Sequence, residues 1–253
     1  MTEQYPQRDI NDGDPNLGSL RENFSFFDEF MGIYSLIAPG TTNGIGEQNW
    51  NGSVVDSGRI RSVPGIPESS VGIVDHIGQA EIVLGAGAPS VVAINQAQVP
   101  LAGIRFQAEI NLVDIGTPTV EEFAYIVSIA GGVGGGTFTD GFGFIYDCRS
   151  SANWLVVTDN SGGGEITTTI DTGVLVVADT WFTLGARYYV DLSQCNFFIN
   201  GSLVATSTTN LPTNPPLFGN AFPIITIDRA GGAAVAARRT LVDYFYMQRT
   251  IAR

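Results

Sequence analysis

Apolar and polar residues alternate along long stretches of this chain, and that period of two constrains the fold more than any other feature. In residues 104–112 every second residue is apolar, and residues 182–190 repeat the pattern. Successive side chains of a β-strand point to opposite faces, so each segment predicts a strand with one buried and one solvated face. The residues predicted to be buried are Phe106, Ile110, Leu184 and Tyr188, and those predicted to face solvent are Arg105, Glu109 and Thr183.

Further strand candidates follow one another between turn signals. They are residues 71–76, 81–84, 91–95, 122–129, 141–147, 154–158, 165–170, 224–228 and 240–248. Asn200-Gly201 predicts a hairpin, because a type I′ turn needs positive φ at both central positions. Only residues 118–125 are expected to hold a helical turn. About a dozen antiparallel strands without an internal repeat favour a two-sheet jelly-roll sandwich over a barrel.

The first 22 residues lack this pattern and are polar and rich in chain-breaking residues. We therefore predict an extended N-terminal arm, 1–22, followed by one sandwich domain, 23–253. A few buried apolar side chains contribute a few kcal/mol each at about 25 cal/mol per Å². Ordering about twenty backbones costs about 1–2 kcal/mol apiece. The arm is thus expected to be held by another chain, with packing on its own domain as the alternative.

The charge balance excludes several functions. The chain carries 25 acidic and 12 basic residues, a formal charge of −13, and every basic residue is arginine. Without lysine there is no phosphate-loop lysine, Schiff-base lysine or Ser–Lys dyad. An acidic surface also argues against nucleic acid or an anionic membrane as partner. The first residues resemble no secretion signal, and no apolar run approaches the ~20 residues of a membrane span, so we expect a protein made in a host cytoplasm and not secreted.

Catalytic machinery is not recognisable, and we expect no enzyme and no cofactor. A retaining glycosidase needs two carboxylates about 5–5.5 Å apart, which on one strand means acids at i and i+2 or i+4. The adjacent acids Asp28–Glu29 and Glu121–Glu122 would point to opposite faces. His76 is the only histidine, so a Ser–His–Asp site or a histidine metal site would have to be built around it.

Metal and redox sites are also weakly indicated. Residues 9–14 resemble the start of a calcium loop but lack the bidentate glutamate at its twelfth position, and calcium stays an open alternative there. Cys148 and Cys195 form no metal or redox motif. If the strands between them form a simple meander, the two thiols lie at opposite ends of one sheet, so we expect both to be free.

An ordered series of short motifs carries a family resemblance over roughly residues 25 to 250. Its parts are Asp140-Gly141-Phe142-Gly143-Phe144, Asn153-Trp154, Asp171-Thr172-Gly173-Val174, Thr180-Trp181-Phe182-Thr183-Leu184, Phe197-Phe198-Ile199-Asn200-Gly201, Thr208-Thr209-Asn210-Leu211-Pro212 and Leu241-Val242-Asp243-Tyr244-Phe245. Phe30 to Tyr34 and Gly72-Ile73-Val74-Asp75 fit the earlier strands. The series resembles the laminin-G/concanavalin A-like jelly rolls of tailed-phage structural proteins. The resemblance implies this fold and a virion setting, and it implies no catalytic residue.

The leading hypothesis is a capsid decoration (cement) protein or head fibre on the virion surface. It would bind the major capsid protein or other copies of itself, with a trimer favoured. The arm residues expected to make those contacts are Tyr5, Arg8, Ile10 and Leu17. The alternative is a receptor-binding tail fibre or spike domain that recognises carbohydrate through Tyr34, Trp50 and Phe218. The third hypothesis is a glycan-degrading enzyme of the same fold.

Overall fold

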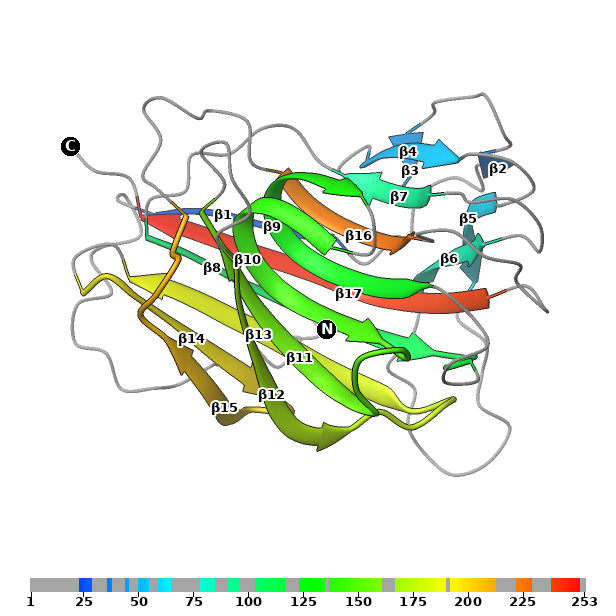
Figure 1. Cartoon of the computed structure of the whole chain (residues 1–253). Helices are drawn as coiled ribbons and strands as arrows, with labels where there is room; N and C mark the ends of the chain where they lie inside the picture. Colours follow the sequence, from blue (N-terminus) through cyan, green and yellow to red (C-terminus); the bar gives the residue numbers. More distant parts are fainter. Residues whose placement is uncertain are drawn as a thin grey trace, which may run out of the picture.

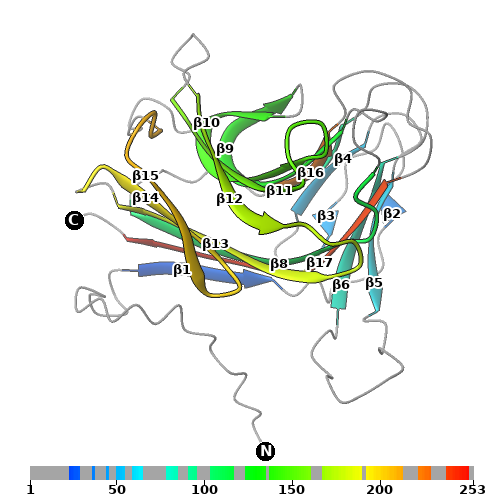
Figure 2. The same ribbon diagram turned by 60° about the horizontal axis from the view of Figure 1, so that its bottom comes forward.

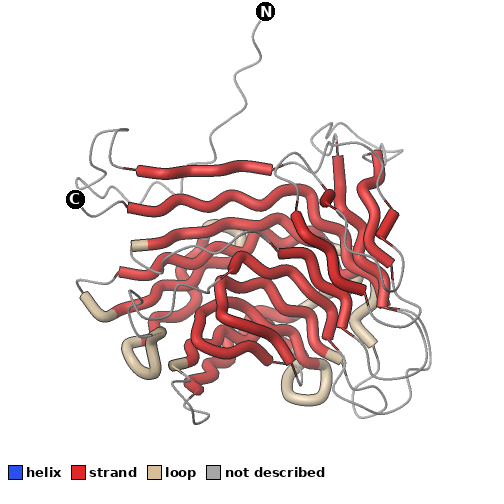
Figure 3. The backbone as a smooth tube through the Cα atoms, turned by 90° about the horizontal axis from the view of Figure 1, so that it is seen from above, coloured by secondary structure: helices blue, strands red, loops and turns tan. Residues whose placement is uncertain are grey.

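Two antiparallel β-sheets packed face to face form the part of the chain that the structure describes (Figure 1). The structure is a computed structural model. It describes residues 23–28, 36–37, 44–45, 50–54, 59–64, 78–84, 91–95, 103–116, 123–134, 137–160, 167–189, 192–212, 222–228 and 238–250. Within these ranges there are seventeen strands and no helix (Figure 3). The all-β jelly-roll sandwich expected from the alternating pattern is confirmed.

Sheet A follows the order β15-β14-β13-β8-β17-β6-β5-β2, and β1 also pairs with β17. Its strands are β1 (Asn23–Asp28), β2 (Leu36–Ile37), β5 (Arg59–Pro64), β6 (Gly78–Leu84), β8 (Ile104–Leu112), β13 (Trp181–Tyr189), β14 (Gln194–Ile199), β15 (Ser202–Ser207) and β17 (Arg238–Thr250). The long strand β17 pairs with β8 along one edge. On its other edge β6 and β1 follow one another end to end.

Sheet B follows the order β12-β11-β10-β9-β16-β7-β4-β3. Its strands are β3 (Gly44–Ile45), β4 (Trp50–Val54), β7 (Val91–Asn95), β9 (Ala124–Gly134), β10 (Thr137–Asp147), β11 (Asn153–Asp159), β12 (Thr167–Leu175) and β16 (Phe222–Asp228). Figure 2 shows sheet B curving above the flatter sheet A.

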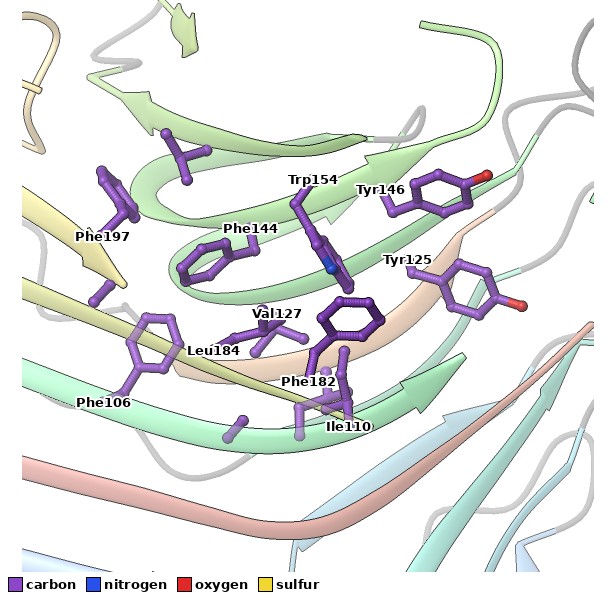
Figure 4. Close-up of a cluster of buried hydrophobic side chains, with 14 of the residues drawn as sticks. Phe106, Ile110, Tyr125, Val127, Phe144, Tyr146, Trp154, Phe182, Leu184 and Phe197 are labelled. Atoms are coloured by element: carbon purple, nitrogen blue, oxygen red, sulfur yellow. The ribbon is translucent and has the colours of Figure 1, made fainter. Parts of the chain in front are cut away.

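The main core fills the space between the sheets and is unusually aromatic. Phe106 of β8 stacks on Phe245 of β17 with ring centroids 5.6 Å apart. The ring of Trp154 on sheet B packs edge to face against that of Phe182 on sheet A, with ring centroids 5.8 Å apart (Figure 4). Such offset and edge-on pairs add about 0.5–1.5 kcal/mol beyond the area they bury. The four residues that the alternation predicted to be buried all belong to this cluster: Phe106, Ile110, Leu184 and Tyr188.

The polar side of those segments is less solvated than the alternation alone implies. Arg105, Glu109 and Thr183 are partly exposed, so they lie outside the core as predicted. Gln107 and Asn111, which alternate with the core residues of β8, are nevertheless buried. Strands flank β8 on both sides, and each buried amide has a hydrogen-bond partner: Gln107 donates to the Tyr244 hydroxyl and Asn111 to Asp179 Oδ1 at 3.3 Å.

Close approach of β9 and β10 explains two glycines. A Cβ added to Gly141 would lie 2.3 Å from the carbonyl oxygen of Ile129, and one added to Gly143 would lie 2.3 Å from that of Val127. The intervening Phe142 points into the core on the other face. Small residues on one face and large rings on the other suit a sheet that curves strongly toward the side of the small residues.

Several sequence expectations need adjustment. Five of the seventeen strands lie between residues 23 and 64, where the sequence shows little alternation and the only segment assigned was Phe30 to Tyr34, through the family resemblance. Residues 30–34 lie outside the described residues. Residues 124 and 125, expected at the end of a helical turn, begin strand β9, and the rest of that expected turn falls largely outside the described residues. The segment 71–76 also lies outside them. The Asn200-Gly201 hairpin is confirmed, with φ of 50° and 79°.

The cysteines are free, but the reason given above is wrong. The strands between them are not a meander, because β11 and β12 belong to sheet B whereas β13 and β14 belong to sheet A. Cys148 and Cys195 therefore enter the shared core from different sheets, and both are buried.

Burial should make these thiols unreactive in the folded protein. It raises the pKa of the Cys195 thiol well above its usual value, so almost no nucleophilic thiolate forms at neutral pH. We expect iodoacetamide to label neither cysteine under native conditions and both in denaturant without reductant. Mass spectrometry of the alkylated protein measures this. A disulfide surviving in denaturant would contradict the arrangement of the two sheets.

Candidate functional site

The outer face of sheet A combines aromatic rings, guanidinium groups and amides on neighbouring strands. The strand register places these side chains in rows across β13, β8 and β17. One row consists of Arg187, Arg105 and Gln248; the next of Gly185, Gln107 and Tyr246; and the third of Thr183, Glu109 and Tyr244. Strand positions hold side chains more rigidly than loop positions, so this face is a preorganised surface.

Two arginines face each other directly in the first row. Arg105 of β8 and Arg187 of β13 are cross-strand partners. Each guanidinium lies over a tyrosine ring, Arg105 over Tyr246 at 5.9 Å and Arg187 over Tyr189 at 4.7 Å. Like charges on opposed residues normally destabilise a sheet, and the cation–π contacts offset part of that repulsion.

The middle of the face is held by a hydrogen bond between side chains. The amide nitrogen of Gln107 donates to the hydroxyl of Tyr244. The hydroxyl of Tyr246 donates to Gln248 Oε1 at 3.2 Å. Both tyrosines stay partly exposed, so each offers part of its ring beside a polar group. This combination can bind a ligand that has both apolar and hydroxyl surfaces.

The outer face of sheet B has a different character. Its described residues include a cluster of small and aliphatic side chains that are at most 8% exposed: Ala124, Ile126, Ala130, Phe138, Ile145, Leu155, Val157 and Ile224. A covered apolar layer offers no open binding surface. Most exposed polar residues in the described part of sheet B lie on its edge strand β12, whereas sheet A carries partly exposed polar residues across β13, β8 and β17.

Two carboxylates of sheet B accept hydrogen bonds from neighbouring backbone and side-chain groups. Asp171 accepts hydrogen bonds from the Gly173 backbone, Ser151 Oγ and Asn153 Nδ2 at 2.8–2.9 Å, and these hold the pKa of that carboxyl below its usual value. Asp159 is buried and accepts the backbone N–H of Asp140 at 2.7 Å. This hydrogen bond satisfies the backbone N–H of Asp140, a residue of β10 whose φ is 47°.

The Asp147 carboxyl is a further example at the β10–β11 turn. Burial acts to raise its pKa, but hydrogen bonds and charge from Arg149 outweigh that effect and lower the pKa below its usual value. The ion pair with Arg149 is 2.7 Å long. Over the described residues there is no group of three or more His, Cys, Asp or Glu side chains arranged to hold a metal ion.

Most of the site residues proposed from the sequence lie outside the described part of the chain. These are the arm residues Tyr5, Arg8, Ile10 and Leu17, the loop residues Tyr34 and Phe218, and His76 together with residues 9–14. Trp50 begins β4, and its backbone alone is described. The contacts expected of these residues remain predictions.

The outer face of sheet A was not predicted as a site from the sequence. The alternation indicates the polar sides of 104–112 and of 182–190 only separately. The face arises from the pairing of β8 with β13 and β17, which are distant in sequence. The available signal was an arginine on the polar face of each segment, an uncommon residue type in a chain with 12 basic residues.

Comparison with known proteins shows the fold and no family. No protein-family model and no curated protein sequence matches this chain. In the described ranges no helix is long and apolar enough to cross a membrane.

Solved structures with this architecture are jelly-roll, concanavalin A-like β-sandwiches. LamAcat from Zobellia galactanivorans is 10% identical, with a TM-score of 0.52, over 88% of this chain and 96% of that one. A LamA variant from the same organism, in complex with laminaritriose and laminaritetraose, aligns with the same identity and TM-score over 88% and 98%. A protein of unknown function from Shewanella oneidensis MR-1 is 13% identical, with a TM-score of 0.53, over 91% and 89%. At such identities the likeness shows a shared jelly-roll sandwich fold, and it indicates no phage origin.

Proposed function

We propose that this chain is a non-catalytic recognition module that binds a saccharide through the outer face of sheet A. The observation that carries the proposal is the placement of the partly exposed Tyr244 and Tyr246 on β17, where the buried amide of Gln107 on β8 holds the Tyr244 hydroxyl. Tyrosine rings pack on the C–H faces of sugar rings, and amides and hydroxyls bond sugar hydroxyls. The complex of a LamA variant with laminaritriose and laminaritetraose supports the proposal, because it places saccharides on a protein of this fold.

Replacing Tyr246 with alanine should weaken saccharide binding about tenfold or more, as expected for a central aromatic anchor. A glycan array followed by calorimetry on the best ligand measures this. Gln107→Ala should act in the same direction. Leu203→Ala is the matched control, because Leu203 is 58% exposed and lies at the far edge of sheet A. Unchanged affinity in Tyr246→Ala, with an unchanged melting temperature, would refute the site.

Prolonged incubation of the protein with its best saccharide ligand separates binding from catalysis. Because the fold is shared with LamAcat, the fold alone does not decide between a binding module and an enzyme. A catalytic alternative would draw on Asp140 and Asp159, which lie on the neighbouring strands β10 and β11, where the backbone N–H of Asp140 donates to the Asp159 carboxylate. We expect intact ligand after prolonged incubation. Product release that Asp159→Asn abolishes would replace the binding proposal with the enzymatic one.

A second proposal is that the module is assembled on a virion as a capsid decoration protein. The motif series in the sequence motivates it, and one structural observation supports assembly of this kind. Strands β12 and β15 are the edges of their sheets and lie in contact with each other. Leu175, Val177 and Leu203 are 47–58% exposed on or beside them. Edge strands carrying exposed aliphatic groups are ready to pair with another chain.

Binding to undecorated capsids tests this assembly. Changing Leu175 and Leu203 together to serine should reduce capsid occupancy sharply while the sandwich stays folded. Deleting residues 1–20 should do the same if the arm reaches the major capsid protein or another copy. Full occupancy by both variants would exclude the edge and the arm as anchors. Saccharide binding by the variants should be unaffected, which separates the two proposals.

A further inference from the structure

The first row of the outer face of sheet A is a line of hydrogen-bond donors. It runs through Asn196 of β14, Arg187 of β13, Arg105 of β8 and Gln248 of β17, which are successive cross-strand partners. Neighbouring strands lie about 4.8 Å apart, so the line extends about 14 Å, enough for a short oligosaccharide. All four residues are on the face opposite the core, since their strand neighbours point inward.

Hydrogen bonds within the face orient both flanking amides. Asn196 Oδ1 accepts from Gln194 Nε2 at 2.7 Å and from Thr206 Oγ1 at 2.9 Å. Gln248 Oε1 accepts from the hydroxyl of Tyr246 at 3.2 Å. The oxygens are therefore engaged within the protein, and the polar ends left to a ligand are the two NH₂ groups, which only donate.

The two arginines add positive charge at the centre of this line: Arg105 is partly exposed, whereas Arg187 is only 9% exposed and contributes its charge from beneath the surface. A guanidinium donates through five N–H groups and accepts none, and its flat fork matches a carboxylate. The buried Nε–H of Arg105 donates no hydrogen bond in the described part of the chain. A buried donor without an acceptor is costly, and a bound anion would add acceptor oxygens to this guanidinium.

From this geometry we infer that the saccharide recognised on sheet A is acidic and carries carboxylate groups, as polyuronates do. The inference rests on the proposed function. A neutral sugar offers hydroxyls that both donate and accept, whereas a row of donors that includes the partly exposed guanidinium of Arg105 is satisfied best by an acceptor that is negatively charged. The chain as a whole carries a charge of −13, so binding of an anion depends on the local positive charge of this row. The tyrosines of the neighbouring rows then hold the sugar rings.

Matched ligand pairs test the charge requirement. The full chain is titrated with oligomers of galacturonate, mannuronate and glucuronate and with the methyl ester of each, which keeps the sugar and removes the charge. At least one acid should bind about tenfold more tightly than its ester, as expected for charge-assisted hydrogen bonds. Added salt should weaken binding of the acid and leave that of the ester nearly unchanged.

Variants assign the preference to the two arginines. Arg105→Gln and Arg187→Gln should each bring the affinity for the acid toward that for the ester, with ester binding retained. Arg149→Gln is the matched control, because Arg149 pairs with Asp147 at the β10–β11 turn and its loss removes the same charge elsewhere. Melting temperatures show whether each variant is folded.

The outcomes separate this inference from the function beneath it. Equal binding of acid and ester, or binding only of neutral saccharides, overturns the charge requirement and leaves saccharide recognition standing. Equally tight binding of poly-glutamate with the same arginine dependence overturns the saccharide class. Failure of every acidic and neutral saccharide to bind the full chain overturns both proposals.

Discussion

Replacing Trp154 with alanine is expected to lower the free energy of unfolding by about 3–5 kcal/mol. The indole is fully buried on β11 and meets three rings, those of Phe144, Tyr146 and Phe182, at 5.8–6.4 Å. These rings come from both sheets, so truncation leaves a cavity at the centre of the sandwich that neither sheet can fill alone. Urea unfolding followed by far-UV circular dichroism gives the change from the shifted midpoint at constant slope.

The phenylalanine variant is the informative control. The Nε1–H of Trp154 is buried and has no acceptor in the described structure. Trp154→Phe keeps a ring in the cluster and removes this unsatisfied donor, so its stability should be within about 1 kcal/mol of the parent. A loss as large as that of Trp154→Ala would mean that the indole nitrogen is satisfied and that its hydrogen bond, more than its volume, stabilises the core.

The second large effect is expected for Gly143→Ala, which should cost at least about 3 kcal/mol, at the top of the usual range for overpacking. The added methyl group would lie 2.3 Å from the carbonyl oxygen of Val127 and 2.6 Å from Ser128 Cα and Cβ. The obstacle is mostly backbone, so relief requires β9 and β10 to move apart. Thermal and urea unfolding should agree on the loss.

A double variant tells whether the backbone is the obstacle. Ser128→Gly removes the nearest side-chain atom but leaves the Val127 carbonyl in place. We expect it to restore little of the stability lost in Gly143→Ala. Full rescue would show that the two strands accommodate an alanine once the side chain is gone. Gly173→Ala is a useful comparison: with φ at 70° and nothing within 4 Å of the added methyl, it tests backbone strain without a clash.

Local patterns predicted the elements of this fold well where strands are long. The alternation in residues 104–112 assigned the inward and outward sides of β8, because side-chain direction depends only on the backbone of the strand itself. The Asn200-Gly201 turn was predictable for the same reason. The short strands between residues 23 and 64 depend on pairing with distant partners, and their sequences show little of their own pattern.

Such local patterns could not predict the candidate site. Arg105 and Arg187 meet only because β8 pairs with β13, and Tyr246 joins them only because β17 inserts on the other side of β8. Register between strands so far apart is decided by the packing of the whole core, which no short segment encodes. The burial of Gln107 has the same origin. Individual residues on the face were predictable, and their assembly was not.

The position of β17 has a consequence for the order in which the protein acquires its structure. This strand pairs with β8, β6 and β1, all of which precede it in the chain. At about 5–20 residues per second, a ribosome takes several seconds to synthesise the segment that separates β8 from β17. During that interval the nascent chain holds strands whose partner does not yet exist. Sheet A can therefore close only after nearly all of the described chain has been made, and any chaperone that acts on this protein must protect open strand edges for that long.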